Sequence, residues 1–191
     1  EIICVNDGST DDSPHILAEY ALKDERIRII HKENGGLVAA RKTGVLAAAG
    51  KYVAFVDSDD WIEADMYEHL YQTAEGHQVD MVTCGFFLEG NYTTIHMDTV
   101  PQGKYEDQGM YELRDKAIYN LAEHSSGLKA SLCYKLFRKE LIQGVQCRIP
   151  DEITMAEDKM CLLTALLKCR SVYVFHKPFY HYRIRANSMV N

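Results

Sequence analysis

The chain has 191 residues, of which 47% are hydrophobic and 26% are charged, and this composition is typical of a folded globular domain. Its formal net charge of -7 disfavours a nucleic-acid partner, which would require a basic face. No apolar run approaches the roughly 18 residues that a membrane-spanning helix needs. The six cysteines form no C-x-x-C pair, so buried reduced thiols are expected rather than a zinc site.

The chain opens with apolar runs separated by turn-forming and amphipathic segments. Residues 1–5 predict a buried strand, and residues 27–31 predict a second, shorter one. Between these strands, Asp12 or Ser13 can cap a helix that has Pro14 at its first position.

The same alternation continues along the next segments. Residues 37–49 are Ala-rich and predict a helix that ends at Gly50. Residues 52–56, YVAFV, are apolar on both faces, as expected for a strand in the middle of a parallel sheet. An amphipathic helix is expected at 63–75 and a strand at 79–87, so the pattern predicts an α/β fold.

The second half of the chain is less regular. Residues 91–97 alternate and predict an edge strand, and the polar residues 98–109 predict a loop. The remaining expected elements are a helix at 110–123, a strand running into a short helix at 130–142, a buried helix at 157–169 and a strand at 171–184.

Three acids follow the apolar run 52–56, in the sequence DSDD at 57–60. Asp57 and Asp59 point the same way if the chain stays extended, and a cation would relieve their repulsion. In open α/β sheets, ligands bind at the carboxyl ends of strands, which favours a metal site here. The alternative is that Asp59 or Asp60 caps the helix expected from residue 63.

Other acidic and glycine-rich motifs fit less well. An EF-hand loop counted from Asp57 needs Gly at its sixth position, where this chain has Ile62. A D-x-D phosphatase of the haloacid-dehalogenase type would have Thr or Val at the position of Trp61, although a phosphatase or phosphotransferase with Asp57 as nucleophile stays an alternative. The dinucleotide motif G-x-G-x-x-G is absent.

Four stretches, taken in order, resemble glycosyltransferase family 2, the inverting GT-A enzymes that use nucleotide-sugar donors. Residues 1–13, EIICVNDGSTDDS, are similar to the family's V-D-D-G-S-x-D turn, and residues 34–61 to its N-x-G-x-x-x-A-R-N-x-G stretch leading to D-x-D. Residues 155–167 are similar to its E-D helix start, and residues 180–190 to its Y-x-Y-R-x-x-x-x-S segment. The resemblance implies a GT-A, Rossmann-like, mostly parallel sheet flanked by helices, of the nucleotide-diphospho-sugar transferase type.

The chain departs from this family pattern at three places. Asn6 replaces the first Asp of the turn, and Lys42 stands where Asn is usual. The family also opens with a central strand that ends in P-x-Y-N, and this strand is absent before Glu1. We expect one domain over 1–191 that lacks its N-terminal strand and leaves two strand edges unpaired. A nucleotide-sugar-binding module or inactive fragment is therefore a further alternative.

The resemblance implies that an acceptor hydroxyl attacks the anomeric carbon of the donor sugar. A divalent ion, Mg²⁺ or Mn²⁺, would neutralise the leaving diphosphate. Asp59 is the implied metal ligand, and Asp57 is implied to hold the donor ribose or a metal-bound water. Asp60 is left as a cap of the following helix.

Further donor contacts are implied at four positions. Asp7 would accept a hydrogen bond from the nucleobase edge, and Gly36 begins a helix whose free N–H groups favour an anion. Arg41 lies one turn inside that helix and can reach the base or the diphosphate, and Arg183 would fold over the diphosphate. The alternatives are a surface turn for Asp7 and solvated side chains for the two arginines.

Asp158 is the implied general base, which would take the proton of the acceptor, and Glu157 would orient it. The alternative is that both acids only favour the positive end of the helix dipole. Lys135 lies in a segment that resembles one near the family's acceptor site.

The implied partners are a nucleotide-sugar donor, most simply a UDP-sugar, and a glycan or lipid-linked acceptor. Residues 1–90 would form the donor-binding half and 91–191 the acceptor-binding half. The resemblance implies a cytoplasmic enzyme of cell-surface polysaccharide synthesis and leaves association with the inner face of the membrane open for the parent protein.

Overall fold

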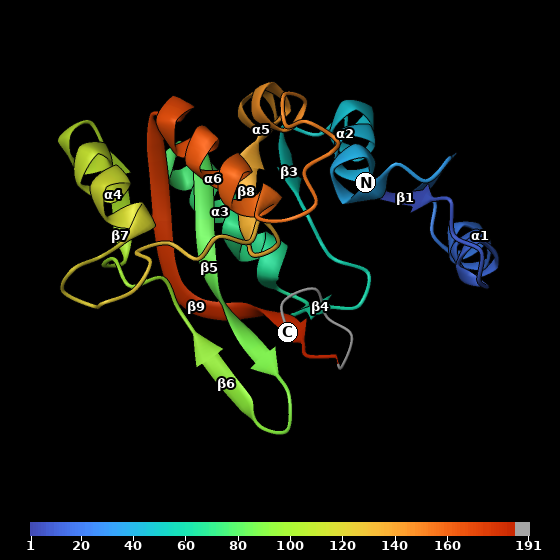
Figure 1. The fold of residues 1–191 in the computed structure, drawn as a ribbon, viewed down its shortest axis with the longest axis horizontal. Helices are drawn as coiled ribbons and strands as arrows, with labels where there is room; N and C mark the ends of the chain where they lie inside the picture. Colours follow the sequence, from blue (N-terminus) through green and yellow to red (C-terminus); the bar gives the residue numbers. More distant parts are fainter. Residues whose placement is uncertain (186–191) are drawn as a thin grey trace.

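The protein, seen in a computed structural model that describes residues 1–185, contains two sheets (Figure 1). The smaller sheet is parallel and pairs β1 (Ile2–Asp7) with β2 (Ile27–Lys32). The helix α1 (Ser13–Lys23) connects these strands, and α2 (Gly36–Ala47) packs against β1. Residues 186–190, the end of the segment that resembles the family's Y-x-Y-R motif, lie outside the described residues.

The larger sheet has seven strands, whose main path runs in the order β3-β8-β5-β9-β4. Its strands are β3 (Tyr52–Ala54), β4 (Trp61–Ile62), β5 (Met81–Glu89), β6 (Thr93–His96), β7 (Gly103–Glu106), β8 (Lys135–Arg138) and β9 (Ser171–Arg183). The β5–β9 pairing is parallel and the other pairings in this sheet are antiparallel. The α/β prediction is confirmed, but the sheet is mixed rather than mostly parallel, because β6 and β8 return alongside β5.

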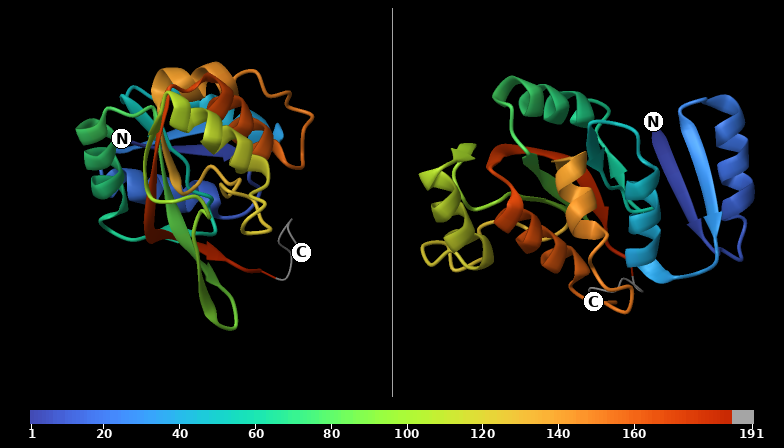
Figure 2. Two further views of the ribbon diagram at one scale, coloured as in Figure 1. Left: turned by 90° about the vertical axis from the view of Figure 1, so that its left-hand side faces the viewer. Right: turned by 90° about the horizontal axis from the view of Figure 1, so that it is seen from above.

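Helices cover both faces of the larger sheet (Figure 2). The helix α3 (Met66–His77) packs on one face, while α4 (Gln108–Ile118), α5 (Lys139–Gln146) and α6 (Glu157–Lys168) pack on the other. Successive residues of β5 point to opposite faces, so Met81 joins the core of α4, α5 and α6, and Val82 joins the core of α3. All described helices are too short or too polar to span a bilayer.

The strand β3 differs from its prediction. It spans three residues, pairs antiparallel with β8 and lies at one end of the sheet, so its placement in the middle of a parallel sheet was wrong. Its apolar residues still have cover on both faces: Val53 packs against the core of α4, α5 and α6, and Tyr52 and Ala54 pack against that of α3. An apolar run of this kind therefore indicates two covered faces and does not distinguish a central strand from an edge strand.

The loop predicted for 98–109 contains a strand. β7 pairs antiparallel with the start of β9, from Ser171 to Val174. Within it Tyr105 packs against the core while Lys104 and Glu106 form an ion pair. One inward residue between two charged ones is too short a pattern to predict a strand from sequence.

A groove of about 770 Å³ lies between the two sheets. Among the described residues, β1 pairs only with β2, and β3 pairs only with β8, so each presents a free edge. Ile3 and Val5 line the groove from β1, Val53 lines it from β3, and Gly44 and Val45 line it from α2. These free edges agree with the expectation of two unpaired strand edges.

Candidate active site

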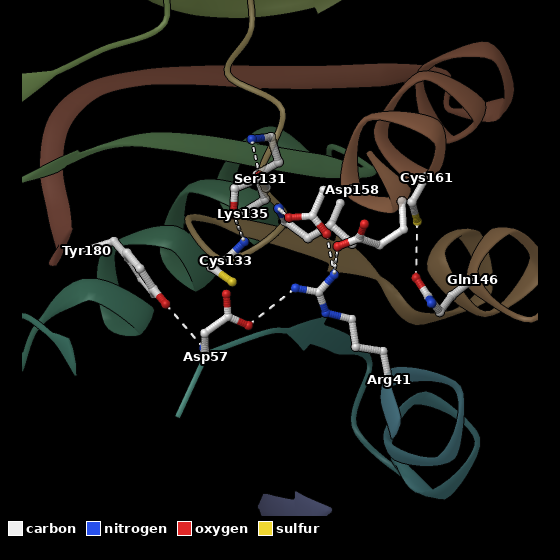
Figure 3. A network of polar contacts seen from close by, with 11 residues as sticks. Arg41, Asp57, Ser131, Cys133, Lys135, Gln146, Asp158, Cys161 and Tyr180 are labelled. Carbon is white, nitrogen blue, oxygen red and sulfur yellow. Dashed lines mark hydrogen bonds and ion pairs between the residues drawn. The ribbon is translucent and has the colours of Figure 1, made fainter. Parts of the chain in front are cut away.

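One end of the groove is acidic, and Figure 3 shows Arg41 between two of its acids, Asp57 and Asp158. Asp57 and Asp59 follow β3, Glu157 and Asp158 form the start of α6, and Arg41 reaches between them from α2. Three segments that are distant in sequence therefore meet at one place, and all of their residues named here were predicted as site residues.

Arg41 connects the two acidic segments. It lies on the buried face of α2 together with Val38 and Val45, as helical spacing dictates. Its Nη2 donates to Asp57 Oδ1 at 3.2 Å, and its Nη1 donates to Asp158 Oδ1. Burial alone would lower the pKa of Arg41, but the charges of these carboxylates outweigh burial and raise it. The guanidinium therefore offsets the repulsion between the acids.

Asp158 and Glu157 occupy the first turn of α6, where the helix dipole favours negative charge. Asp158 Oδ2 accepts a hydrogen bond from the Leu132 N–H at 3.3 Å. Glu157 Oε1 lies 3.8 Å from Arg41 Nη1. The two acids are thus held from α2 and from the loop that precedes β8, in addition to the effect of the dipole.

Asp59 has the most exposed carboxylate of the acidic groove. Its side chain is 41% exposed, against 34% for Asp57, 20% for Asp158 and 14% for Glu157. Its ion pair with Arg185 is long, at 3.6 Å between Arg185 Nε and Asp59 Oδ2. Asp59 is therefore the carboxylate that a ligand entering from solvent can reach most easily.

The carboxylates of the groove suit a divalent ion that takes only one or two of its ligands from the protein. Within residues 1–185, no group of three or more His, Cys, Asp and Glu is arranged to enclose a metal. Mg²⁺ commonly binds through one or two carboxylates and takes its other ligands from water and substrate phosphates. Asp59, with Asp57 nearby, fits this arrangement and does not form an all-protein cage.

Asp60 does not cap the next helix, and that prediction was wrong. The helix, α3, begins at Met66 with Asp65 at its N-cap. Asp60 instead accepts hydrogen bonds from Tyr180 Oη at 2.7 Å and from the Arg183 N–H at 2.8 Å. Burial raises the pKa of Asp60, although both hydrogen bonds oppose this shift. Asp60 therefore ties the acidic turn to β9.

Tyr180 was missed in the sequence. Its hydroxyl also accepts a hydrogen bond from the Asp57 N–H at 3.2 Å, so it contacts both ends of the acidic turn. The sequence signal for Tyr180 was its place as the first residue of the segment 180–190, which resembles a family motif. Sequence reasoning considered the basic residues of this segment and passed over the tyrosine.

Asp7 and Gly36 meet at the start of α2, outside the lining of the groove. Asp7 accepts hydrogen bonds from the N–H groups of Gly35 at 3.0 Å and Gly36 at 2.7 Å, and from Lys32 Nζ at 2.5 Å. Burial would raise the pKa of Asp7, but these donors lower it. Gly36 has a φ of 82°, which favours glycine. The N–H groups that were predicted to bind an anion of the donor therefore donate their hydrogen bonds to Asp7.

Arg183 lies at the margin of the site. Its guanidinium is 5.0 Å from the centre of the Trp61 ring, and Trp61 in turn stacks on His181. Arg183 does not line the groove, whereas its neighbour Tyr182 does. Its role over a diphosphate stays a prediction.

The fold is that of the GT-A class. The crystal structure of S. aureus TarS 1-349 in complex with UDP-GlcNAc matches 98% of this chain and 50% of that chain, with a TM-score of 0.77 and 21% sequence identity. The match therefore extends over nearly all of the sheets and helices described above. This likeness confirms the predicted fold class.

The chain belongs to glycosyl transferase family 2, whose model matches residues 1–143. It is 40% identical over 192 residues to the putative glycosyltransferase EpsH of Bacillus subtilis, covering 100% of this chain and 54% of EpsH. It is 30% identical over 191 residues to the poly(ribitol-phosphate) beta-glucosyltransferase of Bacillus spizizenii, covering 98% of this chain and 28% of that protein. The chain thus spans about half of EpsH and less of the second relative, and the resemblance to the family is confirmed.

Proposed function

We propose that this domain is an inverting glycosyltransferase, which moves a sugar from a nucleotide-diphosphate donor, a UDP-sugar, to a hydroxyl acceptor. The observation that carries the proposal is the acidic groove, in which Asp57, Asp59, Glu157 and Asp158 converge around Arg41. Membership of the family supports this reaction class. The TarS domain, which shares the fold, has been crystallised with UDP and with UDP-GlcNAc, and this supports a UDP-sugar as donor.

Asp158 acts as the general base. The acceptor oxygen attacks the anomeric carbon, the bond from that carbon to the diphosphate oxygen breaks, and the acceptor proton passes to Asp158. The nucleoside diphosphate leaves with the electron pair of the broken bond, and a single displacement of this kind inverts the anomeric centre. Glu157 lies beside Asp158 and orients it through their shared contact with Arg41.

Asp57 and Asp59 bind the donor side of the groove. Asp59 would hold a divalent ion, Mg²⁺ or Mn²⁺, which when bound supplies Lewis-acid stabilisation to the diphosphate. Asp57 is positioned by Arg41 and by Tyr180, and its second carboxylate oxygen, which accepts no hydrogen bond within residues 1–185, is available to the donor ribose. Arg41 keeps the acids of both segments close together before the donor arrives.

The remaining donor contacts extend from this centre. Asp7, at the end of β1, contacts the nucleobase edge, and Gly36 supports this contact by donating its N–H to the Asp7 carboxylate. Arg183 turns from Trp61 towards the diphosphate, because a phosphate offers a stronger partner for a guanidinium than an aromatic ring does.

The acceptor is a glycan or lipid-linked glycan in cell-surface polysaccharide synthesis, on the cytoplasmic side of the membrane. A relative whose name states poly(ribitol-phosphate) beta-glucosyltransferase supports a polymeric acceptor for this chain. The D-x-D phosphatase alternative would make Asp57 a nucleophile, and the family match over 1–143 favours the transferase.

Calorimetric titration of UDP, with and without Mn²⁺, tests the donor site. We expect binding that requires Mn²⁺ and that weakens by about tenfold or more in Asp59→Ala, because a charged contact to the metal–diphosphate pair is lost. Asp12→Ala is the matched control, since Asp12 is an exposed acid with no side-chain cap bond at α1. UDP binding that ignores both Mn²⁺ and Asp59→Ala would contradict the proposal.

A further inference from the structure

Lys135 is a fully buried cation beside the acidic groove (Figure 3). It begins β8 and has 0% exposure. Its Nζ donates to the carbonyl oxygens of Lys129 and Ser131, both at 2.7 Å, and lies 4.1 Å from the centre of the Tyr134 ring. Burial lowers the pKa of Lys135, and the charge of Asp98 offsets part of that effect. Burying an ammonium group is costly, and an apolar side chain such as Met would fill a similar volume.

The two carbonyls that Lys135 holds belong to the loop 129–132, which borders the groove. Ser131 lines the groove, and the Leu132 N–H donates to Asp158 Oδ2 at 3.3 Å. Asp158 therefore has two separate contacts, an ion pair with Arg41 and a hydrogen bond from this loop.

Asp98 holds the same loop from the other side. Its Oδ1 accepts the Lys129 N–H at 2.7 Å, and its Oδ2 accepts the hydroxyl of Thr83, on β5, at 2.7 Å. Both Asp98 and Thr83 are buried. Buried polar groups thus fix the loop to two strands of the sheet, β5 and β8, and such fully satisfied networks favour one loop conformation.

We propose that Lys135 is a positioning residue, which fixes the loop 129–132 so that the Leu132 N–H holds the carboxylate of Asp158 in the groove. The inference rests on the proposed role of Asp158 as the base. Lys135 contacts neither donor nor acceptor, and it acts through the loop alone. Without its two hydrogen bonds the loop shifts, and Asp158 keeps only the contacts that it makes with Arg41.

Kinetics of Lys135→Met test this inference. We expect kcat to fall by about 10- to 100-fold, the effect of a small misplacement of a catalytic group, while the KM for the UDP-sugar stays within about twofold. Asp57 and Asp59 lie in another segment, so donor binding is retained. An unchanged kcat, or a KM that rises as much as kcat falls, would overturn the inference.

Arg114→Met is the matched control. Arg114 also donates to two carbonyls, of Leu166 at 2.8 Å and Cys169 at 3.0 Å, but these lie at the far end of α6 and Arg114 does not line the groove. Its loss should lower the melting temperature and leave kcat within about twofold. An equal fall of kcat in both variants would assign the Lys135 effect to stability and reject positioning.

Hydrogen–deuterium exchange gives a second readout, which does not depend on activity. In Lys135→Met, the peptide covering 128–134 should exchange faster, while peptides of β5 keep the wild-type rate. Equal acceleration of both peptides would contradict local fixation of the loop.

If Lys135→Met does not fold, Asp98→Asn probes the same loop from its other anchor, with the same expected loss of kcat at constant donor KM. Absence of transfer by the wild-type chain would overturn the proposed function, and the exchange measurement would still decide whether Lys135 fixes the loop.

Discussion

Arg41 explains how the acidic groove is stable before any ligand binds. Its guanidinium is buried, contacts Asp57 and Asp158 directly, and lies 5.7 Å from the centre of the Phe55 ring. Sequence reasoning assigned Arg41 to the donor, because a family motif points to the ligand and not to the neighbouring acids. A buried cation that bridges two segments becomes visible only when the fold brings those segments together.

Asp60 yields a prediction for the pH dependence of stability. Burial, helped by the charges of Asp59 and Asp57, raises its pKa in the folded state above the unfolded value, so protonation stabilises the fold. This contribution is present below the unfolded pKa and is lost as the pH rises through the folded pKa. Asp60→Asn should therefore raise the melting temperature at pH 7, because it removes a partly buried negative charge.

The same substitution should have no effect on the melting temperature well below pH 3.8, the ordinary pKa of an aspartate, because Asp60 is then protonated in both states. Thermal melts of the wild type and Asp60→Asn between that acidic range and pH 7 measure the difference. A gain that persists at the lowest pH would show that the pKa of Asp60 is not its cause.

Residue types and local motifs predicted the acids and Arg41 of the groove, and the structure brings them together. Tyr180 and the Leu132 N–H were not predicted. A tyrosine in an aromatic strand looks like a core residue, and a backbone donor carries no side-chain signal at all. Asp60 was assigned to a helix cap because the start of α3 was expected too early in the chain.

Among the elements, α6 must be anchored firmly, because its first turn carries Glu157 and Asp158. Leu162 is 2% exposed in the core, whereas Leu167 on the same helix is 72% exposed. Leu162→Ala should therefore lower the free energy of unfolding by about 2–5 kcal/mol, from lost burial and the cavity left behind. Leu167→Ala should change it by less than about 0.5 kcal/mol.

Urea unfolding of both variants, followed by circular dichroism, measures these free energies. Equal losses for Leu162→Ala and Leu167→Ala would mean that α6 does not pack on the sheet through the face described here.

Hydrophobic pattern predicted most elements but not how the strands pair. The helices α2, α3 and α6 were expected, α2 from its Ala-rich sequence, α3 from its amphipathic pattern and α6 from its mostly apolar sequence. The mixed direction of the sheet depends on which strands meet, and β8 meets both β3 and β5 only through contacts distant in sequence. The two-residue strand β4 has no sequence signal, because it is defined by its pairing with β9.

Across the fold, the groove between β1 and β3 is flanked by two free strand edges among the described residues. Free edges with apolar residues beside them favour pairing with a further strand. We predict that a strand-forming segment of the family type, added before Glu1, raises the melting temperature by about 5 °C or more, since about 1 kcal/mol shifts it by 2–4 °C in a domain of this size.

A matched segment of equal length with proline at alternate positions is the control for that addition, because proline cannot donate the ladder hydrogen bonds. Differential scanning fluorimetry compares the two. An equal melting temperature for both extended chains would show that the groove does not accept a strand.

The proposed reaction depends above all on Asp158 taking the acceptor proton during sugar transfer, and the transfer rate of Asp158→Asn measures this step. Asn keeps an oxygen for one of the two donors, Arg41 or the Leu132 N–H, and it cannot accept the proton as a carboxylate does. With a UDP-sugar and a glycan acceptor, we predict that kcat falls by about 10²- to 10⁴-fold while Mn²⁺-dependent UDP binding is retained. Turnover at the wild-type rate by Asp158→Asn would rule out Asp158 as the base.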